Sequence, residues 1–182
     1  MACRDKFTFG KADVMHVFTD GSLEGEGDTD FSAGLGAVLV DEFGTSRHSL
    51  MNRDKRKYNS FGGKIYQLEI LPMIMSCVAF AEEISSKCIY IHVDNVAAQC
   101  ALINAGSVNR SSRSLVYLYL DFEQRLKFIP WVSRVASSSN IADGPSRSST
   151  EEVMGLGTER FKFPEEVFRF IIQEFIKKSD SI

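Results

Sequence analysis

The sequence predicts an α/β domain in which helices flank a mixed β-sheet. Three strand-like segments open the chain, and helical and strand-like segments then alternate. The strand-like segments are short and rich in β-branched residues, whereas the helical ones carry apolar residues three and four positions apart. With 182 residues, of which 44% are hydrophobic and 25% charged, the chain is long enough to bury one core and has a globular composition.

The first three expected strands form an antiparallel meander. Residues 15–18 include β-branched and aromatic side chains and lead into Thr-Asp-Gly-Ser, which predicts a short buried strand followed by a turn. Residues 34–40 form the second strand, in which glycines indicate a close backbone approach, and residues 47–51 form the third. The acidic stretch 23–30 and the basic stretch 52–64 are expected to be loops.

The middle of the chain predicts a helix, a strand and a second helix. Residues 65–84 show helical spacing, but Pro72 predicts either a late start or a distorted first turn. Residues 88–93 are expected to form a buried strand. Asn95 can then cap a helix that runs to about residue 105.

The last part of the expected domain contains a helix, a strand and a short helix, at residues 114–126, 128–135 and 140–147. A linker and an amphipathic helix at 164–178 follow. We therefore expect one domain at residues 1–148 and a C-terminal extension at residues 149–182.

Composition restricts the setting of the protein. No segment has the roughly 20 apolar residues that a membrane-spanning helix needs, and no signal peptide is recognisable. The four cysteines form no CxxC pair, which favours a reducing intracellular compartment, the cytoplasm or the nucleus. The net charge of -3 argues against a protein that coats nucleic acid without specificity.

Four isolated acids lie at the ends of expected elements, namely Asp20, Glu69, Asp94 and Asp143. Carboxylates gathered at strand ends repel one another unless a proton or a cation separates them, and two divalent cations would support phosphoryl chemistry there. Some of these acids also have ordinary interpretations. Asp20 can form a turn and Asp94 can help to cap a helix, whereas Glu69 has no such alternative.

Four motifs, in this order, resemble the ribonuclease H family, and specifically the RNase H domains attached to retroelement reverse transcriptases. The motifs are Phe-Thr-Asp-Gly-Ser at 18–22 with Gly-Leu-Gly-Ala-Val at 34–38, Gln-Leu-Glu at 67–69, His-Val-Asp-Asn at 92–95 and Asn-Ile-Ala-Asp-Gly-Pro-Ser-Arg at 140–147. The first and last motifs are the most specific.

The resemblance implies a five-stranded mixed sheet and hydrolysis of the RNA strand of RNA–DNA hybrids by two Mg²⁺ ions, with Mn²⁺ as the alternative. It implies that Asp20 bridges both ions, that Glu69 and Asp94 hold one, and that Asp143 holds the other. Contacts to 2′-hydroxyls would select RNA. A reverse-transcriptase polymerase domain is a further implied partner.

Candidate contacts to nucleic acid lie in two local basic patches and in the motifs. Residues 47–57 carry a net charge of +4 and residues 105–134 carry +3. Within the second patch, Ser112 and Arg113 offer a backbone N–H and a cation to a phosphate. The motif residues expected to contact the hybrid are Ser22, Asn95 and Arg147.

Two features depart from the family pattern, and one aromatic residue is ambiguous. The segment 131–140 contains no histidine, which predicts slow product release, and the segment 106–113 is too short for a basic handle helix, which predicts weaker hybrid affinity. Trp131 lies in an expected strand and is therefore expected to pack against the protein rather than to stack on bases.

The favoured function is a metal-dependent RNase H-type endonuclease, but two alternatives stay open. The chain could instead be a binding or tethering domain of a reverse-transcriptase assembly, with little cleavage. It could also be another nuclease of this fold, such as a 3′–5′ exonuclease or a resolvase. Exonucleases usually carry Asp-x-Glu on the first strand, where Gly21 and Ser22 follow Asp20 here.

Overall fold

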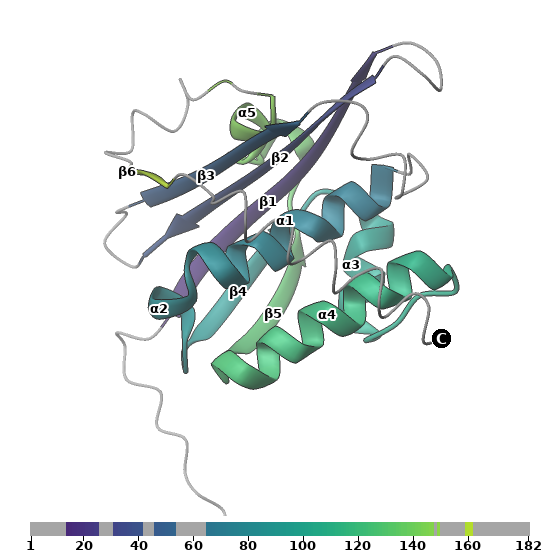
Figure 1. Cartoon of the computed structure of the whole chain (residues 1–182). Coiled ribbons are helices and arrows are strands. Elements are labelled where there is room, and N and C mark those ends of the chain that lie inside the picture. The colour runs from purple at the N-terminus through teal and green to yellow at the C-terminus, as the bar shows by residue number, and fades with distance from the viewer. Residues whose placement is uncertain are drawn as a thin grey trace, which may run out of the picture.

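The computed structural model describes residues 14–25, 31–41, 46–53, 65–147, 149 and 159–161. They form a mixed sheet flanked by helices, as the sequence predicts (Figure 1). The strands are β1 (Val14–Gly25), β2 (Phe31–Val40), β3 (Ser46–Arg53), β4 (Cys88–Val93), β5 (Ile129–Arg134) and β6 (Glu159–Phe161). Their order in the sheet is β5-β4-β1-β2-β3-β6.

The pairing of the strands places the end of β4 next to β1. β1 is antiparallel to β2, and β2 is antiparallel to β3. β4 is parallel to both β1 and β5, and it ends at Val93 beside the middle of β1, which continues to Gly25. The sheet has six strands rather than the expected five, because the short β6 pairs with β3.

The helices are α1 (Ile65–Ala79), α2 (Ala81–Ile84), α3 (Val96–Ile103), α4 (Arg110–Leu126) and α5 (Asp143–Ser146), and a 3₁₀ turn spans Ser137–Ser139. Successive residues of β2 and its neighbour β1 point to opposite faces of the sheet, and α1 and α5 contact residues on different faces. Gly34 and Gly36 face the backbone of α5, whereas Gly21, which pairs with Leu35, faces α1. The two helices therefore cover opposite faces of the sheet.

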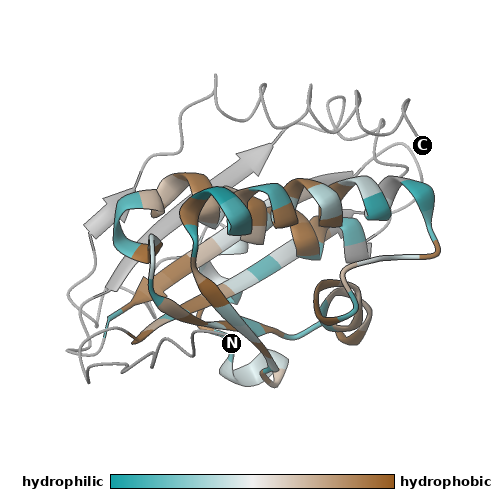
Figure 2. Cartoon of the chain, turned by 90° about the horizontal axis from the view of Figure 1, so that it is seen from below, coloured by the Kyte–Doolittle hydropathy of each residue, from teal (hydrophilic) through white to brown (hydrophobic). Residues whose placement is uncertain are grey.

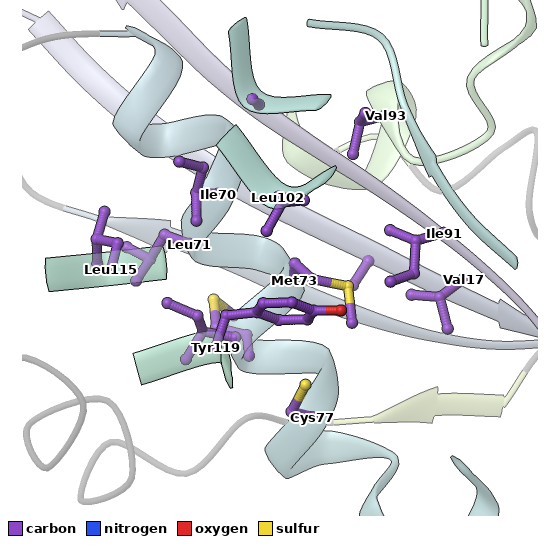
Figure 3. Close-up of a cluster of buried hydrophobic side chains, with 14 of the residues drawn as sticks. Val17, Ile70, Leu71, Met73, Cys77, Ile91, Val93, Leu102, Leu115 and Tyr119 are labelled. Atoms are coloured by element: carbon purple, nitrogen blue, oxygen red, sulfur yellow. The ribbon is translucent and has the colours of Figure 1, made fainter. Parts of the chain in front are cut away.

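The main core lies between the sheet and the pair of helices α1 and α4 (Figure 3). Val17, Ile91 and Val93 point into it from the strands, and Leu71 and Tyr119 point into it from the helices. α1 is buried almost throughout its length, because the sheet covers one side and α4 packs on another. On α4, hydrophilic and hydrophobic residues alternate, as expected for a helix with one face in water (Figure 2).

α1 continues through Pro72, so of the two alternatives that the proline left open the late start is wrong. The helix begins at Ile65. Because proline has no N–H, the carbonyl of Leu68 lacks its usual helical donor, and Gly21 of β1 lies directly against it. A Cβ on Gly21 would sit 2.4 Å from that oxygen. The proline and the glycine together allow β1 and α1 to meet closely.

The chain at Thr-Asp-Gly-Ser does not turn, which corrects the expectation for this motif. β1 continues to Gly25, and Asp20 pairs with Gly36 of β2. α4 also begins earlier than expected, at Arg110, because Asn109 caps it by accepting a hydrogen bond from Ser112 N at 3.2 Å. The expected cap of α3 by Asn95 is confirmed.

Several predictions lie outside the described residues. They include the C-terminal helix at 164–178, most of the linker, and most of the acidic and basic loops. Within the described part of the chain, no helix has the length and apolar character needed to cross a membrane.

The close contact of β2 with α5 makes Gly34 a test of the fold. A Cβ on Gly34 would lie 1.7 Å from the carbonyl oxygen of Ser146, so Gly34→Ala must push α5 away from the sheet. We expect a loss of about 1–3 kcal/mol in the free energy of unfolding, measured by urea titration. Gly106→Ala is the matched control, since its nearest contact is 3.7 Å away. Equal stabilities of the two variants would contradict this packing.

Candidate metal centre

Three acidic side chains from separate parts of the chain meet where β4 ends beside β1. Asp20 lies in β1, Glu69 in α1, and Asp94 directly after β4. One carboxylate oxygen of each lies within 4.8 Å of those of the other two. Asp20 and Asp94 meet because β1 and β4 are parallel neighbours, and Glu69 joins them because α1 lies against Gly21.

Hydrogen bonds from the protein hold two of the three carboxylates. The backbone N–H of Gly21 donates to Glu69 Oε2 at 3.2 Å, and the hydroxyl of Ser146 donates to Asp20 Oδ2. Asp94 Oδ1, in contrast, is buried and has no hydrogen-bond partner among the described residues. A buried carboxylate oxygen without a donor is costly and calls for a cation or a proton.

Burial and mutual repulsion raise the pKa of two of these acids. Burial, followed by the charges of Asp20 and Asp94, raises the pKa of Glu69 to about 9, although the Gly21 N–H opposes the change. Burial also raises the pKa of Asp20 to about 6, against the effect of the Ser146 hydroxyl. In the absence of a cation, the cluster therefore retains a proton at neutral pH.

These residues fit a hard divalent cation. Every donor atom is a carboxylate oxygen, which Mg²⁺, Mn²⁺ and Ca²⁺ prefer over nitrogen or sulfur. A cation would also supply the missing partner of Asp94 Oδ1 and offset the burial and the repulsion that together raise the two pKa values. The geometry thus supports metal binding by Asp20, Glu69 and Asp94.

Asp143, the fourth predicted acid, lies beside this cluster and outside it. It is the first residue of α5, and its Oδ1 accepts a hydrogen bond from Arg147 Nε at 3.0 Å. Its charge contributes to the raised pKa of Asp20, so the two carboxylates are neighbours. The side chain remains 39% exposed, in contrast to Asp20 and Glu69, which are buried.

The side chains of Ser22 and Ser112, two residues expected to contact nucleic acid, lie inside the protein. Both side chains are buried and are already bonded within the protein. Ser22 Oγ donates to the carbonyl of Ser146 at 2.8 Å, and Ser112 Oγ donates to Asn109 Oδ1 at 3.2 Å. These hydroxyls join elements of the fold. The backbone N–H of Ser112, the group expected to bind a phosphate, donates to Asn109 Oδ1 at 3.2 Å.

The other predicted nucleic-acid contacts remain at or near the surface. Asn95 is half-buried, and its Oδ1 accepts from the backbone of Ala97 and Ala98 at the start of α3. Arg113 Nε donates to the carbonyl of Ser107 at 2.9 Å. Arg147 is exposed and bonds to Asp143 as described above.

Sequence reasoning missed Ser146 and Gln67. Ser146 connects α5 to β1 through its hydrogen bond to Asp20. Its position in the same sequence motif as Asp143 could have identified it as a residue of the site. Gln67 Nε2 donates to Ser112 Oγ at 3.2 Å, while its Oε1 is buried without a partner among the described residues. No periodicity in the sequence distinguishes this buried glutamine from an exposed one.

His16 and His92 contact each other, and His92 also contacts Phe18. His92 stacks on Phe18 with ring centroids 4.3 Å apart, and its Nε2 lies 3.0 Å from His16 Nδ1. Trp131, which was expected to pack, is instead 67% exposed.

No protein-family model matches the chain, and no curated protein matches it. Its fold does match solved structures. RNase H1 from the halophilic archaeon Halobacterium salinarum NRC-1 is 18% identical with a TM-score of 0.56, over 76% of this chain and 98% of that chain. LC11-RNase H1 in complex with an RNA/DNA hybrid is 12% identical with a TM-score of 0.52, over 77% of this chain and 99% of that chain.

A viral structure matches as well. The foamy viral protease-reverse transcriptase in complex with an RNA/DNA hybrid is 13% identical with a TM-score of 0.51, over 84% of this chain and 22% of that chain. These matches show that the chain, with its mixed sheet covered by α1 and α5, has the ribonuclease H-like fold.

Proposed function

We propose that the chain is a metal-dependent endonuclease that cleaves the RNA strand of RNA–DNA hybrids with two Mg²⁺ ions. The observation that carries the proposal is the convergence of Asp20, Glu69 and Asp94 where β4 ends beside the middle of β1. The matching structures that contain RNA/DNA hybrids support the choice of substrate.

Each acidic residue has a distinct task in this proposal. Asp20 binds both ions, Glu69 and Asp94 complete one binding position, and Asp143 completes the other. Bound ions would generate the attacking hydroxide and stabilise the leaving oxygen of the phosphodiester. Ser146 orients Asp20 through its hydrogen bond, and the Gly21 N–H orients Glu69 in the same way. The products would carry a 5′-phosphate and a 3′-hydroxyl.

The substrate would approach along the surface that borders the carboxylates. Asn95 follows Asp94 directly, and Arg147 follows the end of α5 and bonds to Asp143, so both are proposed to contact the hybrid near the cut. Arg113, at the start of α4, is proposed to contact a phosphate further along. Selection of RNA over DNA would depend on contacts to 2′-hydroxyls.

A second candidate function is a binding or tethering domain of a reverse-transcriptase assembly with slow cleavage. The observation that favours it is the position of Asp143, which is paired with Arg147 and lies outside the group of three carboxylates. In the foamy viral match, the aligned region is 22% of a longer chain, which supports a reverse-transcriptase context for either function.

Cleavage of an end-labelled RNA–DNA hybrid in the presence of Mg²⁺ tests the proposed activity. We expect Asp20→Asn and Glu69→Gln to lower the cleavage rate about 100-fold or more. Mutation of a residue that only hydrogen-bonds to a metal ligand already lowers activity by up to about 100-fold, and these two residues are proposed to bind the metal themselves. Glu82→Gln is the matched control, since Glu82 is an exposed glutamate on α2.

The same assay separates the candidates. If Asp20→Asn cleaves the hybrid as fast as the wild type, the metal centre is not the source of the cleavage. Hybrid binding without cleavage by the wild type would favour the tethering domain. Double-stranded DNA and single-stranded substrates run beside the hybrid would identify a different nuclease specificity.

Metal binding should release protons, because the carboxylates must be ionised to bind a cation. The raised pKa of Glu69, about 9, means that this side chain is protonated at pH 7 in the metal-free protein. We expect release of about one proton on Mg²⁺ binding at pH 7, and an affinity that increases with pH until about pH 9.

Calorimetric titrations in two buffers with different ionisation enthalpies measure this proton release. Glu69→Gln should abolish the difference between the buffers, since the glutamine has no proton to lose. Mg²⁺ binding by the wild type with no buffer dependence at pH 7 would contradict the protonated state assigned to the cluster.

A further inference from the structure

A pocket of about 390 Å³ lies between α3, α4 and β5, and none of the four predicted acids lines it. Its walls include Leu102 and Ile103 of α3, Leu120 and Glu123 of α4, and Pro130 and Trp131 of β5. The volume is that of sites that bind a small molecule or a bulky side chain. The proposed nuclease activity gives this pocket no task.

The rim of the pocket exposes two large apolar side chains. Trp131 is 67% exposed and Ile103 is 59% exposed, although both line the pocket. Isolated exposed apolar residues are common, but a tryptophan and an isoleucine beside one cavity form a patch that a partner would cover. Tryptophan is also among the residues that contribute most to protein–protein binding.

Among the described residues that line the pocket, Glu123 alone is charged. It is half-buried and forms no salt bridge with any described residue, and burial raises the pKa of its carboxyl group. The Tyr119 hydroxyl one helical turn earlier interacts with this carboxylate but forms no hydrogen bond of normal geometry. A partly buried carboxylate without a cation favours a positively charged ligand, and the ring of Trp131 can also attract a cation.

The exposure of the two rim residues favours a protein segment over a small molecule as the ligand of this pocket. A small-molecule site usually buries most of the surface of its ligand, whereas the two exposed rim residues would leave a small ligand largely in water. A protein segment would cover Trp131 and Ile103 as well as fill the pocket.

We propose that this pocket docks a segment of a partner protein in which a bulky apolar residue stands next to an arginine or lysine. The apolar side chain fills the space between Leu120 and Pro130, and the cation pairs with Glu123. This docking site is independent of the proposed metal centre, so it survives the failure of the nuclease proposal.

The emission of Trp131 provides a direct test, because it is the only tryptophan of the chain. The probe is the capped peptide acetyl-Gly-Leu-Arg-Gly-amide, titrated into the full chain. We expect a saturable blue shift as the indole leaves water, with a dissociation constant of about 1 mM, as befits so short a ligand. Replacing the peptide arginine by glutamine, or its leucine by alanine, should weaken binding about fivefold or more.

Variants of the protein then locate the cation. Glu123→Gln should weaken binding of the arginine peptide about fivefold and leave binding of the glutamine peptide unchanged, which isolates the pairing energy. Glu82→Gln, at an exposed glutamate on α2, should change neither. Circular dichroism checks that both variants are folded.

Three outcomes would overturn the proposal. Equal affinity for the arginine and glutamine peptides would show that no cation is selected. Unchanged binding of the arginine peptide to Glu123→Gln would place the cation elsewhere. Binding of phenethylammonium, included as a small cation, with no binding of any peptide would indicate a small-molecule site instead.

Discussion

The repulsion among three neighbouring carboxylates, two of them buried, is the constraint on which the rest of the site depends. Asp20, Glu69 and Asp94 are held together where β4 ends beside β1, and burial raises the pKa of the first two. A raised folded-state pKa favours the protonated form, so the metal-free protein loses stability as the pH rises from about 4.5 towards 9. A divalent cation removes this cost. Binding of a metal ion to this cluster therefore stabilises the folded protein.

Close backbone contacts keep the carboxylates in place. Gly21 allows β1 to approach the carbonyl that Pro72 leaves without a helical donor, and this contact brings Glu69 beside Asp20 in the middle of β1. On the other face of the sheet, Gly34 allows α5 to approach until Ser146 bonds to Asp20. The two helices that support the site thus pack against β1 and its neighbour from opposite sides. Side chains larger than hydrogen at these glycines would separate the groups that the site requires.

Much of the fold and part of the candidate site could be predicted from the sequence, and the wrong predictions have physical causes. Strand and helix order followed from apolar spacing, and the acids at element ends identified Asp20, Glu69 and Asp94 as neighbours. Local rules failed where tertiary contacts override them. Thr-Asp-Gly-Ser remains extended because β2 pairs with it, and α1 tolerates Pro72 because β1 packs on the free carbonyl. Ser22 is buried and Trp131 is exposed because burial depends on which element covers a strand, which no single-sequence pattern specifies.

The central claim is that Asp20, Glu69 and Asp94 hold a divalent cation. The most direct measurement is a crystal structure of the wild type soaked in Mn²⁺, with anomalous scattering to locate the ion. The account predicts an anomalous peak bound by oxygens of all three carboxylates, with a second peak between Asp20 and Asp143. Absence of a peak at the three carboxylates at pH 8, with Mn²⁺ bound elsewhere in the same crystal, would contradict it.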